Sequence, residues 1–158
     1  MSSIDRNAIE ILRRKWGIGM KIAIAANPLG EELKEKLAAC LQGRGYELID
    51  VSDEDIYTAT MNVVQAIQEK TVERGIVVDD YAEAPFMIAS KNHGIICAPV
   101  FEDYTAAMTR RHNSTQMICL GAAVTAEKLS CELALQFLES DYDGGRHQVR
   151  VDMLDRML

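Results

Sequence analysis

The chain has 158 residues, of which 48% are hydrophobic and 26% charged, a composition typical of one globular domain with a sizeable core. Its formal net charge of -7 excludes nucleic acid as the main partner, since phosphate backbones require a broad basic surface. No apolar run approaches the roughly 18 residues of a membrane span, and charged residues interrupt the N-terminal segment where a signal peptide would be apolar. We therefore expect a cytoplasmic protein with no membrane partner.

Residues 1–19 precede the first predicted strand and carry a helical pattern of apolar side chains. One helical face gathers Ile4, Ala8, Ile11, Leu12 and Trp16. This pattern predicts an amphipathic helical extension that packs on the domain or on a neighbouring subunit. Alternatively, the segment is a translated upstream stretch and Met20 is the ancestral start.

From residue 20 onward, short apolar runs typical of strands alternate with longer helical patterns. The predicted strands are 22–26, 47–51, 75–78, 95–98 and 116–120, and the helical patterns centre on 33–41, 63–67, 87–89, 104–108 and 129–137. This alternation predicts βαβ units, and the near-continuous apolar strands indicate a sheet covered on both faces. We therefore predict an α/β fold with a five-stranded parallel sheet in one domain, residues 20–158, which ends in a C-terminal tail.

The four cysteines are Cys40, Cys97, Cys119 and Cys131, and none of them forms a CxxC or CxxH pair. This spacing favours neither a metal site nor a disulfide framework. Cys97 and Cys119 lie inside apolar runs, where a free thiol behaves as a small hydrophobic side chain. We predict that all four are thiols of the core.

Ligands of open α/β sheets bind beyond the carboxyl ends of the strands. In this chain the candidates are Asn27 after the first strand, Asp79, Asp80 and Tyr81 after the third, and residues 99–103 after the fourth. The third position is acidic, so a phosphate group would be repelled there unless cations from elsewhere in the protein reached over it.

A compact basic motif lies close to the C-terminus. Arg146, His147 and Arg150 follow the paired glycines Gly144 and Gly145, in a chain that is acidic as a whole. Glycines allow turns that are closed to other residues, and guanidinium groups grip phosphate in a bidentate manner. The motif is therefore either an anion site or a solvated basic turn whose charges pair with the aspartates at positions 143, 152 and 155.

Four segments together resemble the type B ribose-phosphate and galactose-phosphate isomerases. They are Met-Lys-Ile-Ala-Ile-Ala-Ala at 20–26, Glu-Leu-Lys-Glu at 32–35, Arg-His-Asn at 111–113 and Asp-Gly-Gly-Arg-His-Gln at 143–148. The resemblance covers about residues 20–158. It implies a Rossmann-like three-layer sandwich and the interconversion of aldose and ketose phosphates without a metal or cofactor. It also implies dimers, often paired into tetramers, in which each active site takes residues from two subunits.

The chemistry of such an isomerase requires an acid/base pair for ring opening, a base that moves a proton between adjacent carbons, and fixed cations for the phosphate. The resemblance implies that His112 is the ring-opening histidine, that Asn113 contacts the sugar, and that Arg146 and Arg150 bind phosphate with His147 beside them. Without the resemblance, the His-Asn pair is more simply a helix C-terminus, where imidazole suits the dipole and asparagine tolerates a left-handed cap.

The other half of the family's site is altered. Where the family has Asp-His after its first strand, this chain has Asn27 and proline, a pair typical of a helix N-cap. Asp79 stands in place of the family's catalytic cysteine, and the loop after it has lost every glycine. Some members use a loop glutamate as the base, but that position is Pro85 here and Glu83 lies two residues away. A further phosphate-binding arginine of the family is replaced by Ala123.

This combination resembles the A subunit of galactose-6-phosphate isomerase, whose B subunit keeps the cysteine. Asp79, Tyr81 and the motif from Tyr142 to Arg150 strengthen the resemblance. The predicted catalytic residues are His112 and Asp79, and the predicted substrate-binding residues are Asn113, Arg146, His147, Arg150, Asn27 and Tyr81. The expected assembly is a homodimer or tetramer, or a hetero-oligomer with a B-type subunit. The alternatives are a stand-alone isomerase with Asp79 or Glu83 as base, and a sugar-phosphate-binding relative without catalysis.

Overall fold

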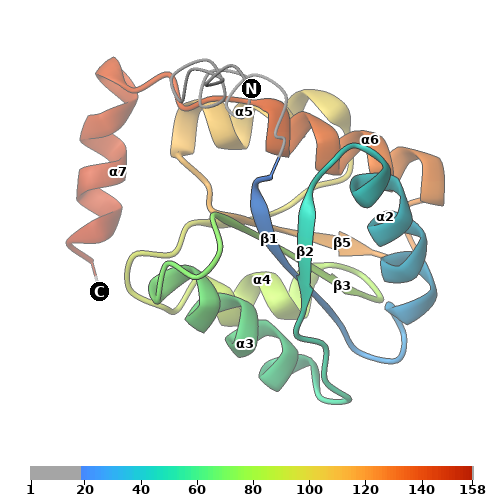
Figure 1. Cartoon of the computed structure of the whole chain (residues 1–158). Helices are drawn as coiled ribbons and strands as arrows, with labels where there is room; N and C mark the ends of the chain where they lie inside the picture. Colours follow the sequence, from blue (N-terminus) through green and yellow to red (C-terminus); the bar gives the residue numbers. More distant parts are fainter. Residues whose placement is uncertain (1–18, 158) are drawn as a thin grey trace, which may run out of the picture.

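The structure, a computed structural model, describes residues 19–157 of the chain. Its centre is a five-stranded parallel sheet in the order β2-β1-β3-β5-β4 (Figure 1). The strands are β1 (Lys21–Ala26), β2 (Glu47–Asp50), β3 (Arg74–Asp79), β4 (Cys97–Pro99) and β5 (Met117–Gly121). Each lies within two residues of its predicted ends, so the predicted sheet is confirmed. The predicted helix at residues 1–19 falls outside the described residues, apart from Gly19.

Helices cover both faces of the sheet (Figure 1). One face carries α2 (Glu31–Gly43), α5 (Asp103–Asn113) and α6 (Glu127–Glu139), and the other carries α3 (Ile56–Gln68) and α4 (Glu83–Ala89). Successive residues of a strand point to opposite faces, so Ile22 and Ile24 enter the first core while Ala23 and Ala25 enter the second. These layers confirm the predicted three-layer sandwich. Within residues 19–157, no helix is both long and apolar enough to cross a membrane.

The start of α2 differs from its prediction. Asn27 does not cap the helix, because its side-chain Oδ1 and its carbonyl oxygen both accept the Gly30 N–H, at 3.2 and 3.0 Å. The helix begins only at Glu31. A Cβ atom at position 30 would overlap the backbone carbonyl of Val78, so the glycine lets the start of α2 lie against β3. Asn27 therefore belongs to a turn before the helix.

The four cysteines follow the prediction only in part. Cys40 on α2 and Cys131 on α6 are joined by a disulfide, with their Cα atoms 6.4 Å apart, so the prediction of free thiols is wrong for this pair. The two helices pack side by side on one face of the sheet, a proximity that a sequence separation of 91 residues conceals. Cys97 and Cys119 are free and buried on adjacent strands, as predicted, with their Sγ atoms 3.4 Å apart.

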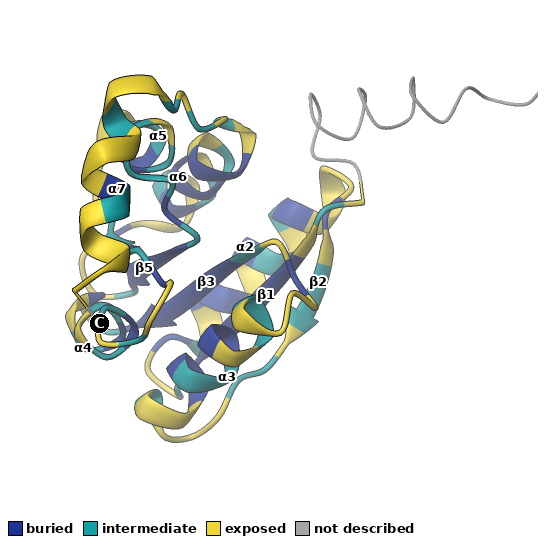
Figure 2. Ribbon diagram, turned by 90° about the vertical axis from the view of Figure 1, so that its left-hand side faces the viewer, coloured by how far each residue is buried: buried dark blue, intermediate teal, exposed yellow. Residues whose placement is uncertain are grey.

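The C-terminal tail forms a turn and a short helix at the edge of the layered body. Gly144 and Gly145 have φ angles of +62° and +57°, a region that other residues adopt only with strain. They lead into the 3-10 turn η1 (Gly145–His147) and into α7 (Gln148–Asp155), which contacts α5. Most of α7 is exposed, and Val151 is its buried side chain (Figure 2). The sequence predicted a tail here but not its helix.

Candidate active site

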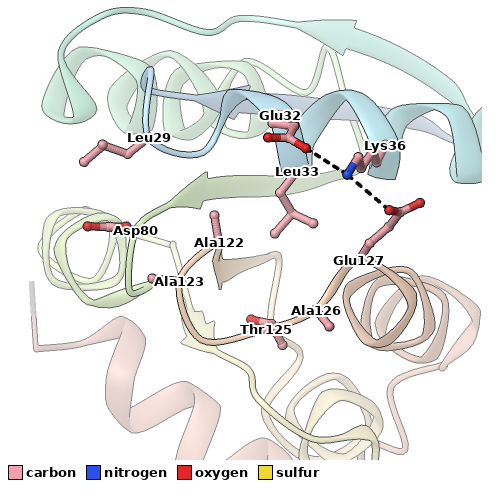
Figure 3. Close-up of a pocket in the computed structure, with 10 residues that line it drawn as sticks. All are labelled: Leu29, Glu32, Leu33, Lys36, Asp80, Ala122, Ala123, Thr125, Ala126 and Glu127. Carbon is pink, nitrogen blue, oxygen red and sulfur yellow. Dashed lines mark hydrogen bonds and ion pairs between the residues drawn. The ribbon is translucent and has the colours of Figure 1, made fainter.

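A first pocket lies at the carboxyl ends of β1, β3 and β5, where the order of the strands reverses (Figure 3). Its volume is about 350 Å³. Lys36 of α2 bridges the gap between two helices, since its Nζ lies 2.9 Å from Glu32 of α2 and 3.3 Å from Glu127 of α6. Asp80, which follows β3, adds a third carboxylate to the lining. With three carboxylates and one ammonium group, this pocket repels a phosphate dianion.

Asp79, at the end of β3, turns its carboxylate toward the backbone rather than into this pocket. Its Oδ1 accepts the Ala82 N–H at 2.6 Å, and its side chain is only 6% exposed. Burial raises the pKa of Asp79, and the charge of Asp80 adds to that shift, while the N–H groups of Ala82 and Tyr81 oppose it. Asp79 thus stabilises a turn in which Ala82 has a φ of +70°.

The other predicted residues of this edge are not gathered into one polar site. Asn27 is engaged with Gly30, and the ring of Tyr81 is 57% exposed. Glu83 begins α4 and is exposed as well. None of the three lines the first pocket. Among residues 19–157, no group of three or more His, Cys, Asp or Glu side chains is placed to hold a metal ion.

A second group of predicted residues does come together, at the end of α5. The Arg150 guanidinium donates through Nη2 to the His112 carbonyl at 3.2 Å and to the Asn113 Oδ1 at 2.9 Å. The ring of His147 stacks on that of His112, with centroids 4.2 Å apart and planes inclined by 10°. Arg146 lies on the same turn and is exposed. We call these five residues the cationic cluster.

A clamp between α5 and the glycine turn holds the cationic cluster in place. The Asp143 N–H donates to the Arg111 carbonyl at 2.9 Å, and the Arg111 Nη2 lies 3.1 Å from the Asp143 Oδ2. α5 ends at Asn113 because Ser114 adopts the left-handed conformation, with a φ of +56°. The left-handed cap is therefore Ser114, not asparagine as the alternative from sequence supposed. His112 consequently lies in the last helical turn, where the helix dipole favours positive charge.

The cluster's electrostatics suit an anion. Partial burial and the neighbouring His112, Arg146 and Arg150 side chains lower the pKa of His147, and Asp143 opposes this shift only in part. The lowered pKa favours the neutral form of the His147 imidazole while no anion is present. A phosphate group beside these residues would supply the missing negative charge and favour the protonated ring.

A second pocket, of about 310 Å³, adjoins the cationic cluster. Its wall comes from the end of β4 and from one face of α5, including Pro99 and Met108, and its polar end is formed by His112, Asn113 and Arg150. The first pocket shares no lining residue with it. The predicted residues therefore divide into an acidic edge at the strand ends and a cationic cluster at α5 and α7.

Sequence reasoning assigned no role to several residues that build this second site. Arg111 anchors the glycine turn, and Thr105, Met108 and Thr109 line the pocket. The spacing of Thr105, Met108 and Thr109 could have indicated this role, because they lie seven, four and three residues before His112 and so share its helical face. The ion pair between Arg111 and Asp143 joins residues 32 positions apart and has no local signature.

The sequence and the fold identify the class of protein. A sequence model of the Ribose/Galactose Isomerase family matches residues 22–154. The chain belongs to this family of sugar-phosphate isomerases. It is 45% identical, over 140 residues, to the galactose-6-phosphate isomerase subunit LacA of Streptococcus equi subsp. zooepidemicus, a match that covers 87% of this chain and 99% of that protein. The corresponding LacA of Clostridium acetobutylicum is 40% identical over 142 residues, covering 88% and 100% of the two chains.

Solved structures agree with this assignment. Ribose-5-phosphate isomerase B of Clostridium thermocellum superimposes with a TM-score of 0.85 at 31% identity, covering 87% of this chain and 97% of the other. The enzyme of the same name from Thermotoga maritima gives a TM-score of 0.84 at 30% identity, with 87% and 98% covered. The predicted Rossmann-like fold and the predicted membership of the isomerase family are therefore confirmed.

Proposed function

We propose that this chain is an A-type subunit of galactose-6-phosphate isomerase that completes an active site together with a cysteine-bearing B-type subunit. Arg146 and Arg150, with His147, bind the phosphate group of the sugar. Asn113 contacts the sugar hydroxyls, and His112 serves the opening of the ring. The identity of 40–45% to proteins named LacA supports the proposal.

One observation carries this proposal: the cationic cluster is assembled, yet no cysteine of the chain can act as the base. Cys97 and Cys119 are 8% and 0% exposed, and burial raises the pKa of Cys119 well above the ordinary value of a thiol. Cys40 and Cys131 are bonded to each other. A cysteine acts as a base in proton transfer only where its thiol is ionised and accessible. The chain thus lacks an accessible thiolate of its own, which supports a base contributed by another chain.

The proposed chemistry assigns one step to each chain. In the closed sugar, His112 gives a proton to the ring oxygen while solvent water accepts the proton of the C1 hydroxyl, which opens the ring to the aldehyde. A base of the B-type subunit then removes the proton from C2 and returns it to C1 through an enediolate, while the proton of the C2 hydroxyl passes to O1, so that aldose becomes ketose. The two arginines hold the phosphate far from the reacting carbons and so fix the position of the sugar.

The stand-alone isomerase, with Asp79 or Glu83 as its base, is the main rival. The raised pKa of Asp79 favours it, because a base of higher pKa binds a proton more tightly. The hydrogen bond to the Ala82 N–H speaks against it, since Oδ1 is already engaged in the turn. Glu83, the other candidate base, lines neither the first nor the second pocket.

A mixing experiment tests the proposal. The purified chain, a B-type relative and their mixture are each assayed on galactose-6-phosphate and on ribose-5-phosphate. We expect turnover of galactose-6-phosphate by the mixture only. Turnover by the chain alone, abolished in Asp79→Asn, would instead establish the stand-alone enzyme. If sugar phosphate raises the melting temperature but no mixture turns over, the chain is a binding protein.

Binding of phosphate is tested separately in the double variant Arg146→Ala, Arg150→Ala. Hydrogen bonds to charged groups contribute about 1.5–3 kcal/mol each, so we expect affinity for sugar phosphate to fall at least tenfold in calorimetry. Arg44→Ala, an exposed arginine after α2, is the matched control and should bind like the native chain. Unchanged affinity in the double variant would refute the phosphate site.

A further inference from the structure

The stacked imidazoles of His112 and His147 have a consequence beyond phosphate binding. Their centroids are 4.2 Å apart and their planes are inclined by only 10°, so one face of the His112 ring is covered. His112 is otherwise a half-exposed side chain in the last turn of a helix. An imidazole in that position has several open rotamers, and proton transfer to a sugar oxygen requires one of them.

His147 is itself held from several directions. Its N–H donates to the Gly144 carbonyl at 3.1 Å, which fixes it in η1. Its Nδ1 lies 3.5 Å from the Arg150 Nη2, and the same nitrogen of Arg150 is bonded to the His112 carbonyl and to Asn113. The glycine turn is fastened in turn to α5 by Asp143. The ring of His147 is therefore a fixed surface, because its backbone is held by the glycine turn and its edge by Arg150, and both of these are bonded to α5.

The remaining edge of His112 faces a carboxylate. The His112 Nε2 lies 3.9 Å from the Asp143 Oδ2, and Asp143 is paired at the same time with Arg111. Asp143 limits the ring at its edge and His147 limits it at its face. Of these two contacts, only the stack covers the plane of the ring and so resists its rotation.

We propose that His147 is a positioning residue for ring opening: its imidazole forms a stacking surface that holds His112 in the orientation from which it reaches the sugar. This role rests on the proposed function and adds to phosphate binding by the same residue. It depends on a planar ring at position 147 and not on the ability of that ring to carry a proton.

The test compares His147→Phe, which keeps a planar ring, with His147→Leu, which removes it. In the chain alone, the ring protons of His112 are followed by NMR. Only three histidines are present, and His93, in the loop after α4, serves as the internal reference. We expect upfield-shifted His112 signals in the native chain and in His147→Phe, and loss of that shift in His147→Leu. Arg146→Ala should leave the signals unchanged.

The second measurement is turnover of galactose-6-phosphate after mixing with a B-type subunit. We expect His147→Leu to lower kcat on the order of tenfold through misplacement of His112, while His147→Phe keeps most of the native kcat. A rise of KM in both variants would report the lost phosphate contact. Equal losses of kcat in the two His147 variants would overturn the proposal.

The two proposals fail in different ways. If no mixture turns over sugar phosphate, the proposed function is refuted and the role in ring opening falls with it, while the NMR measurement still decides whether His147 holds the His112 ring in place. His112 signals that are the same in the native chain and in His147→Leu would then overturn it, and a shift that survives in His147→Phe alone would support it.

Discussion

Asp79 and Asp143 are both aspartates beside a turn, yet the fold uses them differently. Asp79 is buried at the end of β3 and bonds to the backbone of its own turn. Asp143 lies at the surface, where it pairs with Arg111 and faces His112. The first carboxylate is therefore part of the scaffold, whereas the second shapes the surroundings of a proposed catalytic group. Burial and partners decide the role of a residue here, not its type.

The pH dependence of stability tests the environment of Asp79. Burial raises its pKa in the folded chain, so the folded state binds the proton more tightly than the unfolded state does. This carboxyl therefore contributes stability that is fully present below its unfolded pKa and is lost as pH rises through its folded pKa. The substitution Asp79→Asn keeps the side-chain oxygen that accepts the Ala82 N–H and removes the titratable charge.

We accordingly expect Asp79→Asn to gain stability relative to the native chain as pH is raised from strongly acidic to neutral values. Urea denaturation at several pH values measures the difference in free energy of unfolding. Asp79→Ala, which leaves the Ala82 N–H without its acceptor, should cost about 1–3 kcal/mol. A difference between the native chain and Asp79→Asn that is independent of pH would contradict the raised pKa.

Among the elements, α2 and α6 are linked more firmly than packing alone requires. They share a core on one face of the sheet, the Lys36–Glu127 ion pair spans them at one end, and the Cys40–Cys131 disulfide joins them. All three contacts bring together residues from the first and last thirds of the domain. The disulfide therefore closes a loop of 91 residues, which restricts the unfolded chain.

Counting thiols tests this link. The denatured chain should expose two thiols, those of Cys97 and Cys119, before reduction and four after it. Loss of the link in Cys131→Ser should lower the free energy of unfolding by about 4.6 kcal/mol in the chain-entropy model. Cys97→Ala serves as the control and should expose one thiol before reduction. Four thiols without a reductant would contradict the disulfide.

For the whole molecule, the acidic pocket and the cationic cluster lie in separate places, and α7 remains largely unpacked. Val149 and Met153 are 63% and 61% exposed and lie four residues apart on α7, so they form one apolar stripe, and Met157 just beyond the helix is 75% exposed. Arg150 lies on the same helix. A subunit that shares the proposed site must approach α7, so we expect the B-type subunit to cover this stripe.

The affinity between the two subunits tests whether the apolar stripe of α7 lies in their interface. Met153→Lys should weaken the mixed complex about tenfold or more in analytical ultracentrifugation, because it places a charge in the centre of an apolar contact. Gln42→Lys adds the same charge to an exposed position on α2 and should leave association unchanged. If Met153→Lys binds as tightly as the native chain, the stripe lies outside the interface.

The sheet was predictable because its signals are local. Each strand is a short apolar run, and alternation with helical patterns leaves few ways to cover both faces. The boundaries of α2 and the course of α7 were harder to predict from the sequence. The start of α2 depends on the close approach of Gly30 to the Val78 carbonyl, where a Cβ atom would overlap, and the place of α7 depends on its contact with α5. Both depend on neighbours that are distant in sequence.

The sequence by itself determined the fold, the family and the residue types of the cationic motif, since each is written in short contiguous segments. Only the tertiary structure decided that His112 and Asn113 join the motif while Asp79 and Asn27 do not, and that Cys40 meets Cys131. These outcomes depend on contacts across 30 to 90 residues. Such contacts form only when helices pack on a common sheet, because packing fixes directions and distances that spacing along the chain leaves open.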